Sequence, residues 1–163
     1  MNMKKIIDIT LRPTTQNDLE TLFKFQLDKK ANYLAAFTSE DPTDKKAYTE
    51  KWTRLLADER ITTKTVIEDG TIVGSITKYE MNGNAEITYW IGKEFWGKGI
   101  ASSALREFLK LETTRPIYGR VAFDNIGSQK VLTNCGFTKI GTEKGFANAR
   151  MKEIEEFVFE LQQ

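Results

Sequence analysis

The sequence has no histidine and only one cysteine among its 163 residues. Without histidine the chain cannot form a Ser-His or Cys-His nucleophile pair or a histidine-containing zinc site, and a single Cys135 excludes an intrachain disulfide and a cysteine cluster. Any chemistry therefore has to use carboxylates, hydroxyls, water or backbone groups. We expect no metal cofactor.

An excess of one charge and long apolar runs are also missing. The 24 Lys+Arg and 23 Asp+Glu leave a net charge of +1, so the chain lacks the basic field that binds a nucleic-acid backbone. No stretch approaches the roughly 18 apolar residues of a membrane span, and Asp8 and Arg12 interrupt the apolar run after the basic start at residues 1–5, which disfavours a signal peptide. We expect a cytoplasmic protein with no nucleic-acid or membrane partner, folded as a single domain over residues 1–163.

The first third of the chain has one strand pattern followed by two helical patterns. Apolar residues at every second position predict a strand over 7–12, ended by Pro13. A capping-box-like start at Thr15 predicts a helix to about residue 29, followed by a less regular segment over 30–40 with a short helical turn around 33–37. Asp41 as N-cap with Pro42 at the first helical position predicts the second helix.

From residue 62 the pattern becomes extended. Strands over 62–67 and 71–76 flank Asp69-Gly70, a strong hairpin signal, and a second hairpin at 82–84 leads into a strand over 85–91. A helix follows Gly99, then a strand over 117–123, a helix from Asn125 to the glycine at 136, and two final strands. This order predicts an α+β domain with a mixed, mostly antiparallel sheet of about seven strands, about four helices and one parallel crossover.

The stretch from residue 90 to 102 carries the clearest chemical signal. A strand, a glycine-containing turn and a helix N-terminus together aim several backbone N–H groups and the positive end of a helix dipole at one point, which favours an anion. Gly97 and Gly99 would let a phosphate approach the amides closely, and Lys98 adds a cation. The pattern is neither a P-loop nor a Rossmann fingerprint. On these residues alone the turn is either a phosphate site or an ordinary structural turn.

A resemblance to a known family adds to this interpretation. Residues 94–99, Glu-Phe-Trp-Gly-Lys-Gly, resemble motif A of the GNAT superfamily of N-acyltransferases, written [QR]-x-x-G-x-[GA]. Residues 85–91, 96–101 and 125–137 are similar to the RimJ/RimL-like branch, which includes ribosomal-protein N-terminal acetyltransferases. Glu94 departs from the family's Gln or Arg, and because a carboxylate would repel a pyrophosphate, we expect its side chain to turn toward solvent.

The resemblance implies a GNAT-like acyl-CoA N-acyltransferase fold in which two strands splay apart around the pantetheine arm of acetyl-CoA. The pyrophosphate would sit on the turn amides of Trp96, Gly97, Lys98, Gly99, Ile100 and Ala101. The strand that ends with Tyr89, Trp90 and Ile91 would pair with the pantetheine amides. Asn125 would contact the cofactor, and Ser128 matches a position proposed to protonate the departing thiolate.

Roles on the acceptor side are less determined by the sequence. Glu86 is either a base or water-orienting residue, or a solvated or ion-paired strand carboxylate. Ser128 is either an acid or a small residue on a helix face, and a backbone N–H near residues 89 and 90 would hold the oxyanion. Tyr33 and Phe37 lie in a region that resembles the acceptor-binding side of the family, and the loop at 146–148 is a similar candidate.

These observations predict an enzyme that moves an acetyl group from acetyl-CoA to a primary amine by direct attack in a ternary complex. The acceptor would be a protein N-terminal α-amine or a small-molecule amine. The alternative is a non-catalytic module that binds acyl-CoA or a partner protein. The sequence leaves open whether the protein is a monomer or a homodimer.

Overall fold

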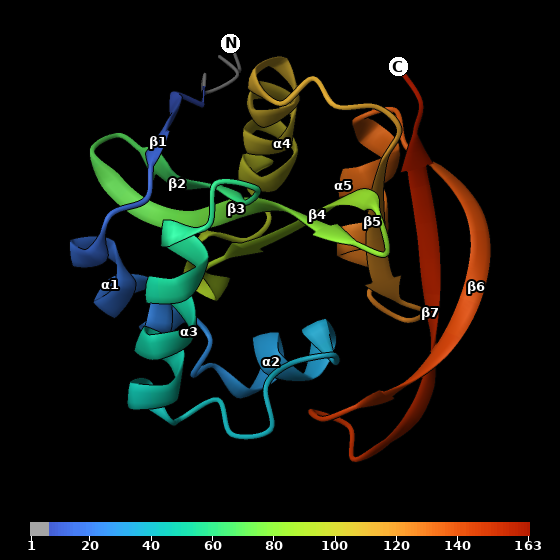
Figure 1. Cartoon of the computed structure of the whole chain (residues 1–163), viewed down its shortest axis with the longest axis horizontal. Coiled ribbons are helices and arrows are strands. Elements are labelled where there is room, and N and C mark those ends of the chain that lie inside the picture. Colours follow the sequence, from blue (N-terminus) through green and yellow to red (C-terminus); the bar gives the residue numbers. More distant parts are fainter. Residues whose placement is uncertain (1–6) are drawn as a thin grey trace, which may run out of the picture.

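The structure is a computed structural model that describes residues 7–163, so the basic residues at the start of the chain lie outside it. Within this range, one seven-stranded sheet has the order β1-β2-β3-β4-β5-β7-β6 (Figure 1). The strands are β1 (Ile9–Pro13), β2 (Thr62–Glu68), β3 (Thr71–Met81), β4 (Asn84–Ile91), β5 (Ile117–Ala122), β6 (Thr138–Ala147) and β7 (Lys152–Leu161). The β4–β5 pair is parallel and the other pairs are antiparallel, which confirms the mixed α+β sheet and its parallel crossover.

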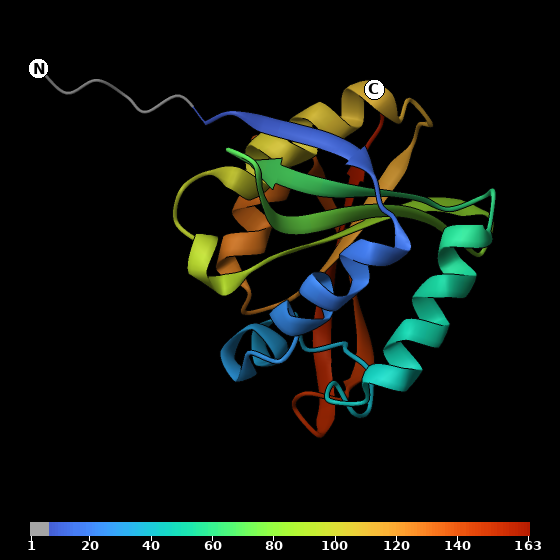
Figure 2. The ribbon, with the colours of Figure 1, turned by 90° about the vertical axis from the view of Figure 1, so that its left-hand side faces the viewer.

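Helices cover both faces of the sheet (Figure 2). They are α1 (Leu19–Phe25), α2 (Lys29–Ala35), α3 (Lys45–Ala57), α4 (Ile100–Leu111) and α5 (Ile126–Asn134). Helices α4 and α5 lie on one side and pack on an apolar core that includes Ile87, Phe108, Leu132 and Phe159. Helices α1 to α3 lie on the other side, where the sheet presents polar residues.

Both short hairpins predicted from the sequence are confirmed. Asp69 and Gly70 have φ of 48° and 77°, and Asn82 and Gly83 have φ of 53° and 79°. Two consecutive positive φ angles are what a type I′ hairpin turn requires, and Asp-Gly and Asn-Gly pairs tolerate them.

Two expectations about the helices are wrong. Helix α3 begins after Asp44, whose side chain accepts a hydrogen bond from the Ala47 amide at 3.0 Å. Asp41 instead accepts from the amide and hydroxyl of Thr43, which forms a local turn before the helix. In addition, the first helix ends at Phe25 and not near residue 29, because Asp28 caps a separate helix α2.

The last hairpin is longer than expected. Strands β6 and β7 pair from Ala147↔Lys152 to Thr138↔Glu160, so residues 146 and 147 belong to a strand, and the turn lies at residues 148–151. This hairpin carries β7 along β5 as its antiparallel neighbour and completes the sheet beyond the parallel crossover.

The parallel β4–β5 pair separates partway along its length. Pairing runs from Ala85↔Ile117 to Ile87↔Gly119 and stops there, although β4 continues to Ile91 and β5 to Ala122. Beyond Ile87 the edge of β4 therefore faces a gap between two strands of one sheet. The candidate active site lies at this gap.

Candidate active site

The turn after β4 presents an open cradle of backbone amides. Gly97 and Gly99 have φ of 78° and 76°, in the left-handed region that favours glycine. A Cβ built on Gly97 meets no atom within 4 Å, so a side chain there would project into open space in front of the turn. Helix α4 begins at Ile100, and its N-cap Gly99 has no side chain to cap the helix, which leaves the first amides of α4 available to an anion.

Trp96 supports this turn, but its backbone N–H is not available to a ligand. The Trp96 backbone N–H donates to the Lys93 carbonyl at 3.1 Å, and its indole Nε1 donates to the Ile91 carbonyl at 2.8 Å. The indole therefore ties the turn to the end of β4, and the free amides begin at Gly97. Glu94 is exposed, in agreement with the expected orientation toward solvent, and Lys98 is also exposed.

Two cavities of about 450 Å³ each meet at the gap between β4 and β5. The first, here called the turn cavity, is lined by the amide cradle and by the start of α5, and its lining includes Ile91, Trp96, Gly97, Gly99, Ile100 and Ala101. The second, the sheet cavity, lies between the polar face of the sheet and α1 to α3, and its lining includes Phe37, Tyr48, Trp52, Tyr79, Arg120 and Glu156. The residues that line both are Ala35, Tyr89, Trp90, Asn125 and Ser128.

Polar groups from β4 and α5 converge at this junction. The Asn125 side chain accepts from the Ser128 amide at 3.3 Å and donates to the Leu34 carbonyl at 3.2 Å, so it caps α5 and holds α2 beside it. The hydroxyl groups of Tyr89 and Ser128 are 2.7 Å apart. Burial raises the pKa of Tyr89 to about 12, so its phenol is protonated at neutral pH.

The indole N–H of Trp90 is an unsatisfied donor at the same junction. Its Nε1 is buried and has no hydrogen-bond partner among residues 7–163. Buried donors are normally paired, and an orphan at a cavity wall favours a bound oxygen acceptor. Together with the open amide cradle, this donor set fits an elongated ligand that carries both carbonyl oxygens and an anionic group.

Glu86 and Arg120 connect strands across the base of the gap. Glu86 is buried, and its carboxylate accepts from Arg120 Nε at 2.9 Å. Arg120 also contacts Glu143 on β6 and, at 3.5 Å, Glu156 on β7. Burial raises the pKa of both Glu86 and Glu156. Glu86 lines neither cavity, whereas Glu156 lines the sheet cavity.

The two aromatic residues proposed for the acceptor side have different positions. Phe37 lines the sheet cavity. The Tyr33 ring is 49% exposed and stacks on the Arg150 guanidinium at 3.8 Å, and it lines neither cavity. Trp52 on α3 also lines the sheet cavity.

Other kinds of site find no support within residues 7–163. No group of three or more His, Cys, Asp or Glu side chains in this range could hold a metal ion. Cys135 lines neither cavity, its thiol lies 3.5 Å from the Ser102 carbonyl, and burial raises its pKa. None of the helices in the described part of the chain is long and apolar enough to cross a membrane.

Comparison with known proteins agrees with this geometry. The sequence model of the Acetyltransferase (GNAT) domain family matches residues 8–138. The Putative ribosomal N-acetyltransferase YdaF of Bacillus subtilis (strain 168) is 30% identical over 145 residues, which are 82% of this chain and 79% of that protein. The Uncharacterized N-acetyltransferase p20 of Bacillus licheniformis is 35% identical over 85 residues, and this match spans only 49% of this chain and 47% of that protein.

A solved structure supports the fold independently of close sequence similarity. The microcin C7 self-immunity acetyltransferase MccE, crystallised with acetyl-CoA and AMP, superimposes with a TM-score of 0.79 at 19% identity, over 95% of this chain and 92% of that one. At this identity the likeness shows the fold. The family match and the relative of 30% identity carry the assignment, and they agree with the RimJ/RimL-like resemblance. The chain belongs to the GNAT acetyltransferase family and is an acyltransferase.

Proposed function

We propose that this chain transfers an acetyl group from acetyl-CoA to a primary amine by direct attack in a ternary complex. The observation that carries the proposal is the meeting of two cavities at Tyr89, Trp90 and Ser128. One cavity ends at an amide cradle that suits a pyrophosphate, and the other opens toward aromatic and acidic side chains. A thioester at the junction would be reached from one side by its cofactor arm and from the other by an amine.

The turn cavity would hold acetyl-CoA. The amides of Gly97, Lys98, Gly99, Ile100 and Ala101 would bind the pyrophosphate, helped by the positive end of α4. The pantetheine arm would lie along the free edge of β4 from Tyr89 to Ile91, beside Asn125. The complex of MccE with acetyl-CoA supports this use of the fold.

The sheet cavity would hold the amine. An α-amine with a pKa of about 7.7–8 is roughly a tenth neutral at pH 7, whereas a lysine-like amine near 10.4 is almost fully protonated. Glu156 faces this cavity and could accept the amine's proton directly or through water. Glu86 would support the cavity through Arg120, whose guanidinium it holds at 2.9 Å.

The remaining steps use groups at the junction. A backbone N–H of β4 near Tyr89 or Trp90 would stabilise the oxyanion formed on the thioester. The Ser128 hydroxyl would hydrogen-bond the departing thiolate. The Bacillus subtilis relative is named a putative ribosomal N-acetyltransferase, which makes an amine of a ribosomal protein the first acceptor to test. We also propose a cytoplasmic protein that is a monomer or a homodimer.

Two measurements on the purified chain test the proposal. Calorimetry should detect acetyl-CoA binding, and a thiol-release assay over peptides, polyamines and aminoglycosides should then show CoA production with at least one amine. Binding without release from any acceptor would support a non-catalytic binding module instead. Absence of binding at millimolar acetyl-CoA would remove the proposed role of the amide cradle.

A further inference from the structure

The side chain of Tyr89 lies where the two cavities meet. Its ring packs against the apolar core on the α4–α5 side of the sheet. Its hydroxyl oxygen lies 2.7 Å from Ser128 Oγ and 3.2 Å from the Ser128 carbonyl oxygen. Two groups of one residue therefore compete for the single proton of the tyrosine hydroxyl.

The positions of the hydrogens allow two arrangements. If Tyr89 donates to the carbonyl, the Ser128 hydroxyl must donate to Tyr89 Oη. The Ser128 proton is then not available to a ligand in the cavities. If Tyr89 donates to Oγ, the Ser128 proton remains free to point into the cavities. The 2.7 Å contact between the two hydroxyls is present in both arrangements. A thiolate bound at the junction would be a charged acceptor that draws the Ser128 proton, and Tyr89 would then donate to Oγ, which is the second arrangement.

We infer that Tyr89 is a positioning residue that donates its hydroxyl proton to Ser128 Oγ and so directs the Ser128 proton toward the thiolate sulfur of CoA. The inference rests on the proposed acetyl transfer. It assigns to the Tyr89 side chain a role that is separate from the role of the β4 backbone in binding the cofactor.

The proton balance shows that Tyr89 and Ser128 act through hydrogen bonds and that both keep their protons. The amine nitrogen forms the new C–N bond, the C–S bond breaks, and sulfur leaves with the electron pair while Ser128 O–H hydrogen-bonds it. The proton lost by nitrogen passes to Glu156 or to water, and the thiolate takes up a proton from water as CoA leaves. A thiol with an ordinary pKa near 8.5 is a far stronger acid than a phenol whose pKa is raised to about 12, so Tyr89 keeps its proton throughout.

A double-mutant cycle on kcat tests the inference. Ser128→Ala should lower kcat by about 100-fold and Tyr89→Phe by about tenfold, within the range of general-acid contributions. In the Ser128→Ala background, Tyr89→Phe should change kcat less than about twofold, because the residue through which it acts is gone. Multiplicative losses in the double variant would overturn the inference. Calorimetry should give the same acetyl-CoA affinity for Tyr89→Phe and wild type.

Tyr118→Phe is the matched control, because Tyr118 lies on β5 and lines neither cavity. It should leave kcat unchanged. A second measurement is independent of turnover: titration of the bound CoA thiol, followed by its ultraviolet thiolate absorbance. Tyr89→Phe and Ser128→Ala should both raise that thiol's pKa, whereas Tyr118→Phe should not. An unchanged thiol pKa in Tyr89→Phe would contradict the inference even if no acceptor amine is found, which separates it from a failure of the proposed function.

Discussion

At the scale of single residues, Gly97 shows most clearly how one position serves the site. Its φ of 78° disfavours other residues, and a Cβ there would enter the open space in front of the amides. Gly70, in the β2–β3 hairpin, has φ of 77° and equally open surroundings, but it lies outside both cavities. A substitution at Gly70 therefore strains the backbone alone, whereas the same substitution at Gly97 also obstructs the ligand.

We predict that Gly97→Val raises the acetyl-CoA dissociation constant roughly tenfold or more, a loss of at least about 1.4 kcal/mol. The valine side chain would block the approach of the pyrophosphate to the turn amides. Calorimetry with acetyl-CoA measures the change. Gly70→Val should lower the free energy of unfolding by a similar amount to Gly97→Val, about 1–2 kcal/mol, but it should leave the acetyl-CoA affinity unchanged. Equal affinities in the two variants would show that the pyrophosphate sits elsewhere.

Asp18 anchors the N-terminal part of the domain. Its buried carboxylate accepts two hydrogen bonds from Arg12 at 2.6 and 2.8 Å and others from the Thr15 amide and the Thr65 hydroxyl. These donors, led by Arg12, lower the pKa of Asp18 from 3.8 to about 2. Because the folded-state pKa lies below the unfolded value, the charged carboxylate stabilises the fold above about pH 4, and this contribution is lost as the pH falls toward 2.

Asp18→Asn should therefore lower the free energy of unfolding by about 1–2 kcal/mol at pH 7, and by progressively less below pH 4. Urea unfolding of both proteins between pH 7 and pH 3 measures this gap. Glu20→Gln is the control, because Glu20 is an exposed partner of Lys45 and should matter by less than about 0.5 kcal/mol. A gap that stays constant down to pH 3 would show that the ion pair is not its origin.

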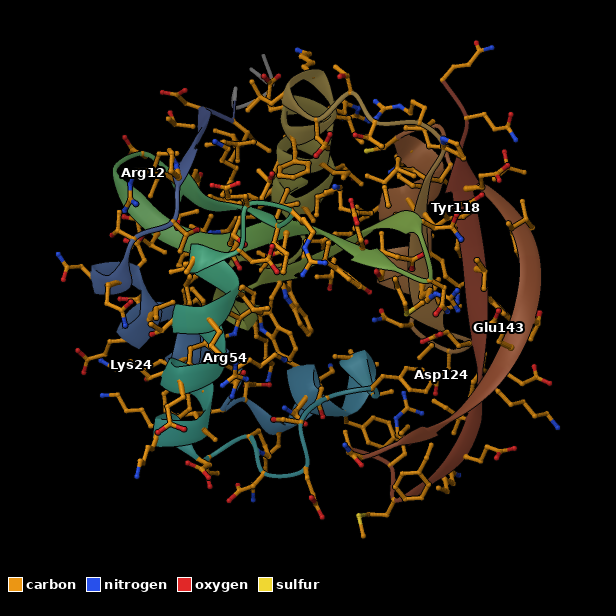
Figure 3. All side chains as sticks on the ribbon, viewed as in Figure 1. Arg12, Lys24, Arg54, Tyr118, Asp124 and Glu143 are labelled. Carbon is orange, nitrogen blue, oxygen red and sulfur yellow. The ribbon has the colours of Figure 1, made fainter. Side chains whose placement is uncertain are left out.

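At the scale of elements, the Glu86–Arg120 pair joins strands that would otherwise separate. Glu86 lies on β4, Arg120 on β5, and Arg120 also reaches Glu143 on β6 and Glu156 on β7. Figure 3 shows Glu143 and Arg12 at opposite ends of the sheet, so this network and the Asp18 network are far apart. Their effects on stability should therefore be additive.

Arg120→Met should destabilise the protein by about 3 kcal/mol at pH 7, because it leaves the buried Glu86 carboxylate without its partner. Without Arg120 the folded-state pKa of Glu86 would rise further above its unfolded value, so the loss should shrink as the pH falls from 7 to 5. Adding Glu86→Gln should recover most of the stability at pH 7. Thermal or urea unfolding of the single and double variants checks both effects, and no recovery in the double variant would contradict this explanation.

Features with a local cause could be predicted from the sequence. The two hairpins depend on adjacent residues that accept positive φ, and the turn at residues 97–99 depends on glycines between a strand and a helix. The N-cap Asn125 and the α5 residue Ser128 also follow from short patterns. For this reason the order of helices and strands along the chain and the parallel crossover were accessible without coordinates, whereas the assignment of the turn at residues 97–99 to a cofactor came from the family resemblance.

Features that depend on tertiary contacts could not be predicted in this way. Asp41 and Asp44 are both acceptable caps, and only the structure shows that Asp44 starts α3 while Asp41 bonds Thr43. Glu156 belongs to an alternating strand, where a carboxylate is typical of a solvated face. Trp52 similarly fits a core position by helical spacing. Their place in the sheet cavity results from the packing of α1 to α3 on the polar face.

At the scale of the whole molecule, the two faces of the sheet have different tasks. One face carries the apolar core under α4 and α5, and the other carries polar residues under α1 to α3. The gap between β4 and β5 connects a cavity on each side, so an acyl donor and an amine could occupy the protein together. Cys135 lies outside both cavities, and the chain has no histidine to activate it. A covalent acetyl-enzyme on this thiol has no support in this geometry.

The initial-velocity pattern of CoA release, with acetyl-CoA and an active amine varied together, tests this central claim most directly. A ternary complex predicts double-reciprocal lines that intersect, because both substrates must be bound before the thioester is attacked. Parallel lines would indicate that CoA leaves before the amine binds, and they would contradict direct transfer across the junction of the two cavities.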